Sequence, residues 1–249
     1  MTDNGGLTNT TTRAVDVAAT PPPASNLRFR AQAQSSNTTL STTSSRVTIP
    51  ATVQAGDQLV LIGSYAFGAS TSPANPTTPT GWTQAGTTVT NQTLQSVVWT
   101  KVAAPADAGS TISADAGTTV ATPLANSSRS TLTVGAYQGV AATGGIAALA
   151  SSQDALTTQH KSPTVTALAG DWVVQYWSDK NSSTTLWTAP GGVIERGTSY
   201  GTGSGRTSAL LADSGAPVAA GTYGGDIATT DFASGRGIAW TFALKPATP

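Results

Sequence analysis

The sequence predicts an all-β protein: a jelly-roll-like β-sandwich of two pseudo-duplicated halves, preceded by an extended N-terminal arm. Three observations support this fold class. Short apolar segments recur between clusters of Gly, Pro, Asn and Ser from Leu27 onward, which is typical of a sandwich or barrel. The segment with the strongest helical tendency, residues 139–156, contains glycines that disfavour a helix. Several motifs also occur twice, in the same order.

The clearest strand is the last, RGIAWTFALK, at residues 236–245. Ile238, Trp240, Phe242 and Leu244 alternate there with small or polar residues and Lys245. A period of two places alternate side chains on one face of a sheet, so these apolar residues should face the core. Other segments with the composition of strands are DQLVLIGSY, SVVWTKVA, STLTVGAYQ and DWVVQYW.

The duplication rests on paired motifs. VQAGDQLVLIGSY at residues 53–65 matches ALAGDWVVQYWSD at residues 167–179 with an offset of 114, and three weaker pairs follow at offsets of 111, 112 and 107. We expect halves at about residues 45–140 and 160–245, each with about four strands, as in a double Greek-key jelly roll. The Gly-Asp pair in each copy is interpreted as a turn, because glycine adopts a positive φ and aspartate bonds nearby backbone donors.

Two regions differ in composition. Residues 1–25 are polar, low in complexity and end in TPPPAS, so they are expected to form an extended arm without a core of its own. Residues 26–249 are expected to form a single β-sandwich domain, because sandwiches of this length often fold as one unit.

The charge balance limits the classes of partner. Only 10% of residues are charged, against about 25% in typical globular proteins, and the formal net charge is zero. This balance provides no basic field for nucleic acid or anionic lipid, so neither is expected as a partner. The first residues lack a basic segment followed by an apolar run, so no signal peptide is expected, and no apolar stretch is long enough for a membrane helix.

Candidate catalytic residues are sparse. His160 is the only histidine and lies before a proline, without a G-x-S-x-G elbow elsewhere, so it is interpreted as an ordinary loop residue. Glu195 is the only glutamate, and a glycosidase pair would need an aspartate as its second member. The aspartates in strand-end or loop contexts are interpreted as turn residues: Asp171, Asp179, Asp213, Asp226 and Asp231.

Two further segments partly resemble binding motifs. Asp179 and Asn181 alternate as in calcium loops, but the rest of an EF-hand loop does not follow. The glycine-rich GTSYGTGSGR at residues 197–206 lacks the strand-to-helix context of a phosphate loop and is predicted to be a hairpin or long loop. No metal, cofactor or catalytic residue is therefore predicted.

The tryptophans offer two interpretations. In DWVVQYW, apolar residues point to both faces of the predicted strand, so the second face is either covered by another segment or exposed. In the exposed case, Trp177, with Trp187 and Tyr200, would form an aromatic platform for a sugar ring or a protein partner. The remaining tryptophans expected in the core or packed on turns are Trp82, Trp99 and Trp240.

The ordered motifs AGDQLVL, PTGWTQAG, VVWTKVAAPADAGSTI and TLTVGAYQGV resemble a β-sandwich module of bacteriophage virion proteins. The module is familiar from tail and surface proteins of phages with actinobacterial hosts, and from some bacterial surface proteins. The resemblance covers roughly residues 45–245. It implies a role in building or decorating a virion after assembly in the host cytoplasm, and it carries no catalytic residues.

The function predicted from these features is that of a non-enzymatic virion structural protein, a head decoration or tail component. Its partners would be other capsid or tail proteins and copies of itself. The arm would add to a neighbour's sheet edge, with Arg13, Val15 and Val17 setting the register. The alternative is a glycan-binding or adhesion module on a virion or cell surface, which would use the Trp177 platform to bind a host-surface glycan.

Overall fold

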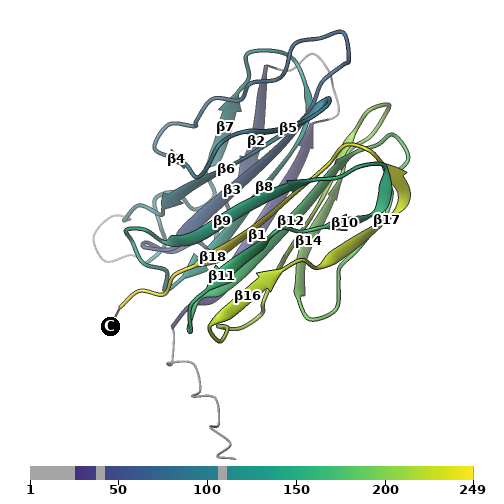
Figure 1. Cartoon of the computed structure of the whole chain (residues 1–249). Coiled ribbons are helices and arrows are strands. Elements are labelled where there is room, and N and C mark those ends of the chain that lie inside the picture. The colour runs from purple at the N-terminus through teal and green to yellow at the C-terminus, as the bar shows by residue number, and fades with distance from the viewer. Residues whose placement is uncertain (1–25, 38–42, 106–110, 249) are drawn as a thin grey trace, which may run out of the picture.

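The computed structural model describes residues 26–37, 43–105 and 111–248, and these form an all-β structure without helices. The prediction of an all-β sandwich is confirmed. Two large antiparallel sheets lie face to face, with the purple-to-teal strands of the first half packed on the green-to-yellow strands of the second (Figure 1). None of the described segments forms a helix long and apolar enough to cross a membrane.

The first large sheet is built by the N-terminal half. Its strand order is β1-β8-β3-β6-β4, and β5 also pairs with β6. The strands are β1 (Arg28–Asn37), β3 (Gln58–Ala66), β4 (Thr83–Gln84), β5 (Val89–Asn91), β6 (Leu94–Val102) and β8 (Arg129–Gln138).

The second large sheet is built by the C-terminal half. Its strand order is β14-β15-β12-β18-β9. The strands are β9 (Ile146–Gln153), β12 (Trp172–Lys180), β14 (Ile194–Tyr200), β15 (Thr207–Asp213) and β18 (Gly237–Leu244). Residues 139–156, the weak helical candidate, therefore contain an edge strand instead of a helix.

Smaller sheets cover the outer faces of both large sheets. On the first sheet lie β2 (Ser44–Thr48) and β7 (Thr119–Pro123). On the second lie the sheet β10-β17-β13 and the pair β11-β16. These strands are β10 (Thr157–Lys161), β11 (Thr164–Ala167), β13 (Trp187–Thr188), β16 (Gly221–Gly224) and β17 (Ile227–Ser234).

The central strands are buried on both faces as a result. In β3 and β18 every residue is buried, although alternate side chains point to opposite sides. The core between the large sheets contains Ile62 and Tyr137 from the first and Tyr176 and Phe242 from the second. The tryptophans predicted to be core or turn-packing residues, Trp82, Trp99 and Trp240, are buried.

The two halves repeat the same arrangement. In each half, the first strand, β1 or β9, is an edge strand that pairs with the last strand, β8 or β18. The last strand then pairs with the strand that follows the Gly-Asp turn, β3 or β12, which pairs in turn with β6 or β15. The sequence comparison missed β1 and β9, because their small and polar residues give a weak apolar pattern. Each half therefore contributes more strands than the four expected.

The Gly-Asp pairs form the predicted turns, with the same bonds in both copies. Gly56 and Gly170 adopt φ angles of 83° and 94°. Asp57 Oδ2 accepts a hydrogen bond from Gln54 N at 2.7 Å, and Asp171 Oδ2 accepts one from Leu168 N at 2.8 Å. Each aspartate thus satisfies a backbone donor three residues earlier, which directs the chain into its strand in one register.

Hydrogen bonds as well as apolar contacts join the large sheets. Trp240 Nε1 donates to Ser96 Oγ at 2.9 Å, the Ser64 and Tyr176 hydroxyls lie 3.0 Å apart, and those of Thr131 and Thr207 lie 2.9 Å apart. Because these polar groups find partners in the opposite half, their burial carries little desolvation penalty. Thr133 Oγ1 and Trp172 Nε1, by contrast, are buried without a partner in the described structure.

Candidate functional site

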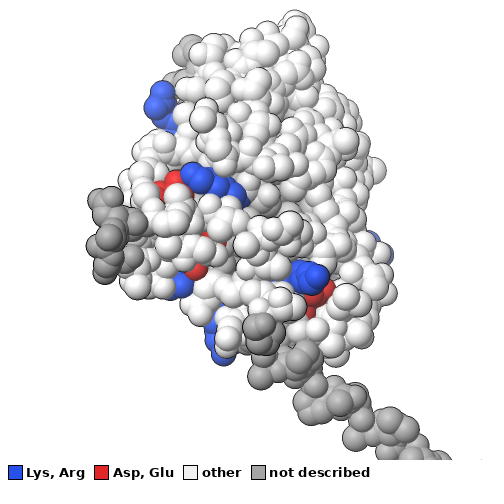
Figure 2. Space-filling view, turned by 90° about the vertical axis from the view of Figure 1, so that its left-hand side faces the viewer, with Lys and Arg blue, Asp and Glu red and all other residues white. Residues whose placement is uncertain are grey.

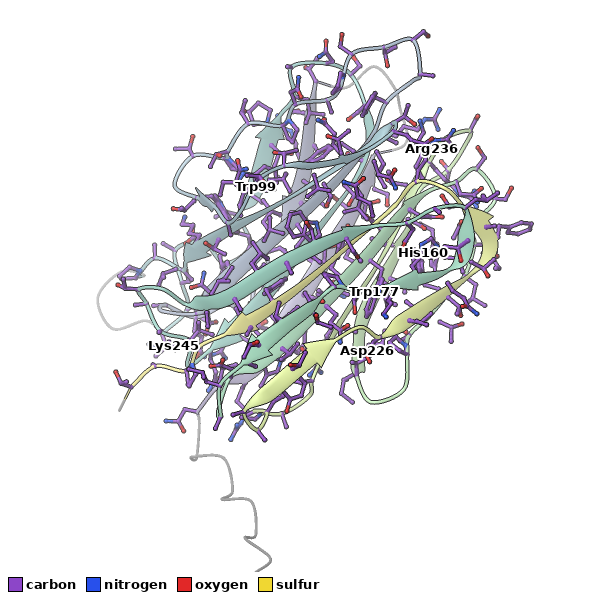
Figure 3. The ribbon with its side chains drawn as sticks, in the orientation of Figure 1. Trp99, His160, Trp177, Asp226, Arg236 and Lys245 are labelled. Carbon is purple, nitrogen blue, oxygen red and sulfur yellow. The ribbon has the colours of Figure 1, made fainter. Side chains whose placement is uncertain are left out.

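The three aromatic residues predicted to form a platform come together, but beneath the surface. Trp177 and Trp187 share an apolar cluster on the outer face of the second sheet, and the partly buried Tyr200 packs against it. Trp187 N donates a hydrogen bond to the Tyr200 hydroxyl at 2.8 Å. Figure 3 places Trp177 inside the second half. The rings of Trp187 and His160 lie next to each other, with their centroids 4.9 Å apart.

The exposed-platform interpretation is therefore wrong for the tryptophans. Trp177 is 0% exposed and Trp187 is 3% exposed, so neither ring can stack on a sugar in this structure. The reason is that β13 and β17 cover the outer face of β12. The alternative interpretation of the sequence, in which another segment covers this face, describes the observed packing.

A buried polar network lies next to this cluster. Asp179 accepts hydrogen bonds from Thr184 Oγ1 at 2.6 Å and from Ser208 Oγ, and Ser208 Oγ accepts a bond from Trp187 Nε1 at 2.7 Å. Burial raises the pKa of the Asp179 carboxyl, although these hydroxyl donors oppose the shift. The oxygens of Asp179 thus serve the packing of the aromatic cluster.

Asp179 and Asn181, which alternate as in calcium loops, both make hydrogen bonds within the scaffold. Asn181 Oδ1 accepts a bond from Ser183 N at 2.9 Å and its amide nitrogen donates to Ala233 O at 2.8 Å, while the Asp179 carboxyl turns into the core. Within residues 26–37, 43–105 and 111–248, no group of three or more His, Cys, Asp or Glu residues is placed to hold a metal ion.

His160 lies in strand β10 and is 1% exposed, so its assignment to a loop is wrong. Its Nδ1 lies 2.7 Å from Asp154 Oδ2 and its Nε2 lies 3.2 Å from Thr230 Oγ1. The Thr230 hydroxyl donates to the backbone oxygen of Phe232 at 2.9 Å. Asp154, His160 and Thr230 thus have the order of groups found in a catalytic triad. The Thr230 hydroxyl, however, is buried and donates to a backbone carbonyl, so these bonds stabilise the fold.

These hydrogen bonds continue into the first half. Asn91 Nδ2, from β5, donates to Asp154 O at 3.0 Å and to Gly237 O at 2.9 Å. A Cβ atom at Gly237 would stand 2.6 Å from His160 Nδ1, so the histidine requires glycine there. The sequence motifs did not indicate Asp154, Thr230 or Gly237, because their roles depend on strands that meet only in the folded chain.

The other candidate carboxylates also make structural bonds. Asp213 receives two hydrogen bonds from Arg196, each 2.8 Å long, and Arg196 stacks on the Phe29 ring with its Cζ 4.2 Å from the centroid. Asp226 accepts from Gln175 Nε2 at 2.7 Å, and Asp231 accepts from Thr185 N at 2.9 Å. Glu195 lies exposed on β14.

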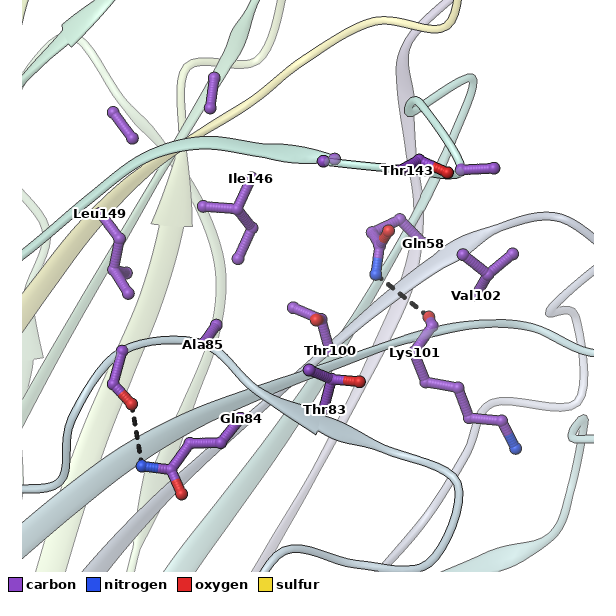
Figure 4. A pocket seen from close by; sticks show the side chains of 16 residues that line it. Gln58, Thr83, Gln84, Ala85, Thr100, Lys101, Val102, Thr143, Ile146 and Leu149 are labelled. Carbon is purple, nitrogen blue, oxygen red and sulfur yellow. Dashed lines mark hydrogen bonds between the residues drawn. The ribbon is translucent and has the colours of Figure 1, made fainter.

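A cleft of about 690 Å³ opens between the edges of the two large sheets (Figure 4). Strand β9 supplies one wall, with Ile146 and Leu149, and strands β4 and β6 supply the facing wall, with Thr83 and Thr100. The backbone at Gly86 approaches β9 closely, since a Cβ atom there would lie 2.7 Å from Leu149 Cδ2.

The polar groups of the cleft are mostly uncharged. Gln58 Nε2 donates to Lys101 O at 3.1 Å, Gln84 Nε2 donates to Gly86 O at 2.8 Å, and Lys101 pairs with Asp115 at 2.5 Å. The charged side chains on the molecular face shown in Figure 2 are likewise few and scattered. No sequence motif indicates the cleft, because its walls come from different halves and contain no residue with distinctive chemistry.

Two other predictions concern loops and the arm. Residues 201–206 of the glycine-rich segment connect β14 to β15 in an antiparallel hairpin, as predicted. Arg13, Val15 and Val17 lie outside the described residues, so their role in the arm stays a prediction.

No protein-family model, curated protein or solved structure matches this chain.

Proposed function

We propose that this chain is a non-enzymatic structural protein of a phage virion, either a head decoration or a tail component. The observation that carries the proposal is the structural use of its reactive side chains: His160, Asp179 and Asp213 are buried and bonded within the scaffold. The ordered motifs that resemble virion β-sandwich modules support the virion assignment.

The architecture suits a protein that must keep its shape. Each large sheet is packed on both faces, and hydrogen bonds such as Ser64–Tyr176 and Trp240–Ser96 join the halves. A rigid, weakly charged block can be repeated in an assembly without strong repulsion between copies.

Residues 1–25 provide the proposed anchor. They directly precede the edge region of the first sheet, where β1 pairs with β8 on one side. An extended segment can add to the sheet edge of a neighbouring protein, with backbone hydrogen bonds giving affinity and alternate side chains giving register. Arg13, Val15 and Val17 are the proposed register residues.

Complementation tests the anchor. Full-length protein and residues 26–249 would be supplied to a phage lacking its own copy, and purified particles would be examined by mass spectrometry. We expect both proteins to show the same melting temperature but only the full-length chain to enter particles. The double variant Val15→Asp, Val17→Asp should fail in the same way, whereas Thr10→Asp should still assemble. Normal incorporation of residues 26–249 would refute the anchor.

The cleft favours a second candidate function, binding of a neutral glycan. Its hydroxyl and amide groups suit hydrogen bonds to sugar hydroxyls, and Ile146 and Leu149 offer an apolar surface to the ring carbons. This site replaces the buried Trp177 platform. Titration with neutral host cell-wall polysaccharide should produce binding that is weakened in Thr83→Val but unchanged in the control Thr119→Val. Equal binding by both variants would argue against the cleft.

A further inference from the structure

Four basic residues lie close together at one end of the sandwich. Figure 3 labels one of them, Arg236. Lys180 ends β12, Arg206 directly precedes β15 and Arg236 directly precedes β18, and these three strands are neighbours in the second sheet. Backbone bonds hold them together, since Lys180 N donates to Arg236 O at 3.2 Å and Asn181 N donates to Arg206 O at 3.1 Å.

The fourth residue comes from the other half. Arg129 begins β8 and donates through Nη1 to Thr202 O at 2.7 Å, in the loop that leads to Arg206. Lys180 reaches in the opposite direction, and its Nζ donates to Phe67 O and, at 2.9 Å, to Thr93 Oγ1. The basic cluster, Arg129, Lys180, Arg206 and Arg236, therefore spans the junction between the halves.

No carboxylate neutralises this basic cluster within the described part of the chain. The ion pairs found there use other basic residues: Arg30, Lys101, His160 and Arg196. The Arg206 guanidinium acts on Asp179, but that carboxyl is buried and receives hydroxyl donors instead of a cation. Repulsion among uncompensated like charges makes the cluster attractive to an anion.

Several donors of the basic cluster also lack acceptors. Arg236 is exposed, and its guanidinium has no hydrogen-bond or ion-pair partner among residues 26–37, 43–105 and 111–248. Nε of Arg129 and Nε of Arg206 are buried without an acceptor in the same part of the structure. Lys180 uses its ammonium for two bonds, so one of its three N–H donors remains.

A hollow of about 200 Å³ lies beside two residues of the basic cluster, Lys180 and Arg236. Its lining also includes Ser182 and Gly205, whose N–H already donates to Ser182 Oγ at 2.7 Å, and the apolar residues Leu156 and Ala233. The Ser182 hydroxyl keeps its own proton to donate. The volume of the hollow accommodates one tetrahedral oxyanion. A guanidinium fork and a lysine ammonium are the side chains that proteins commonly use for phosphate and sulfate oxygens.

The electrostatics of Lys180 agree with this charge distribution. Burial, followed by the nearby positive charges of Arg236 and Arg129, lowers the pKa of the Lys180 ammonium to about 8. An anion in the hollow would offset the repulsion from both arginines and raise this pKa again.

We propose that the hollow between Lys180 and Arg236 binds a phosphate or sulfate group. This site is separate from the cleft and depends on neither proposed function. The group is either a free anion or a substituent of a larger molecule, such as a sulfated polysaccharide, with the rest of that molecule outside the hollow.

Calorimetry with inorganic phosphate at constant ionic strength, balanced with chloride, tests the site. We expect phosphate to bind and to raise the melting temperature, and Arg236→Gln to weaken binding about tenfold through loss of a charge-assisted hydrogen bond. Arg236 is exposed, so this variant should fold. The matched control Arg46→Gln removes an exposed cation of the first half and should bind phosphate normally.

Two polymers distinguish the sources of the group. Dextran sulfate that binds the native chain, and binds Arg236→Gln at least about tenfold more weakly, would identify a polymer-borne substituent, with neutral dextran as the negative control. Binding of phosphate but not dextran sulfate would identify a free-anion site. If neither anion binds better than chloride, or if Arg46→Gln and Arg236→Gln lose equal affinity, the proposed site is refuted.

Discussion

Replacement of Trp177 by alanine tests whether this tryptophan is a packed core residue or an exposed binding residue. The side chain is 0% exposed and packs with Trp187, Leu210 and Ala239. A fully buried tryptophan cut to alanine costs about 3–5 kcal/mol of unfolding free energy. Trp177 Nε1 has no acceptor within the described structure, so its removal also relieves a buried, unsatisfied donor. We therefore expect a loss of about 3 kcal/mol, at the low end of that range.

Guanidinium chloride unfolding followed by far-ultraviolet circular dichroism measures this loss without relying on tryptophan fluorescence. Trp177→Phe keeps much of the apolar volume and removes the unsatisfied donor, so it should lose less than about 1.5 kcal/mol. Phe232→Ala is the surface control, because Phe232 is 50% exposed and should lose about 1 kcal/mol. If Trp177→Ala costs no more than Phe232→Ala, Trp177 is not part of a packed core and the argument fails.

Three further predictions concern turns, ionisation and close packing. Asp57→Ala should lower the free energy of unfolding by about 2–3 kcal/mol and Asp171→Ala by about 1 kcal/mol. The two differ because Asp57 also pairs with Arg30, whose Nη2 lies 3.1 Å from Asp57 Oδ1, whereas both aspartates bond a backbone N–H. Equal losses in urea unfolding would contradict this. Burial raises the pKa of three tyrosines, Tyr65, Tyr137 and Tyr176, above the ordinary value of 10.0. Above pH 10 the unfolded chain therefore loses these protons before the folded chain does. The free energy of unfolding should then fall by up to about 4 kcal/mol per pH unit. Urea unfolding at alkaline pH measures this slope, and a flat profile would contradict it. Gly86→Ala should lower the free energy of unfolding by about 1–3 kcal/mol, because Gly86 has a φ of +88° and the new Cβ atom would meet Leu149. In a double-mutant cycle, adding Leu149→Ala should recover the part of this loss that comes from the steric clash.

Local features were predictable from the sequence because their causes lie within a few residues. The alternation in residues 236–245 indicated a strand with one face toward the core, and β18 occupies that segment, although both of its faces are buried. The Gly-Asp pairs indicated turns, since the positive φ and the bond to the donor three residues earlier need no distant partner. The repeated motifs indicated two related halves, which have the same strand order.

The candidate sites depended on contacts between distant segments. Apolar residues on both faces of residues 171–177 were visible, but only the position of β13 and β17 decided that Trp177 is covered. His160 likewise acquired its partners Asp154 and Thr230 from separate strands.

The sequence by itself therefore determined the all-β class, the strand-forming segments and the Gly-Asp turns. Only the tertiary structure decided which apolar faces are buried, and it alone created the cleft and the basic cluster at Lys180 and Arg236. The physical reason is range: strand periodicity and turn geometry act between neighbouring residues, whereas burial and charge repulsion depend on which remote strands the fold brings together.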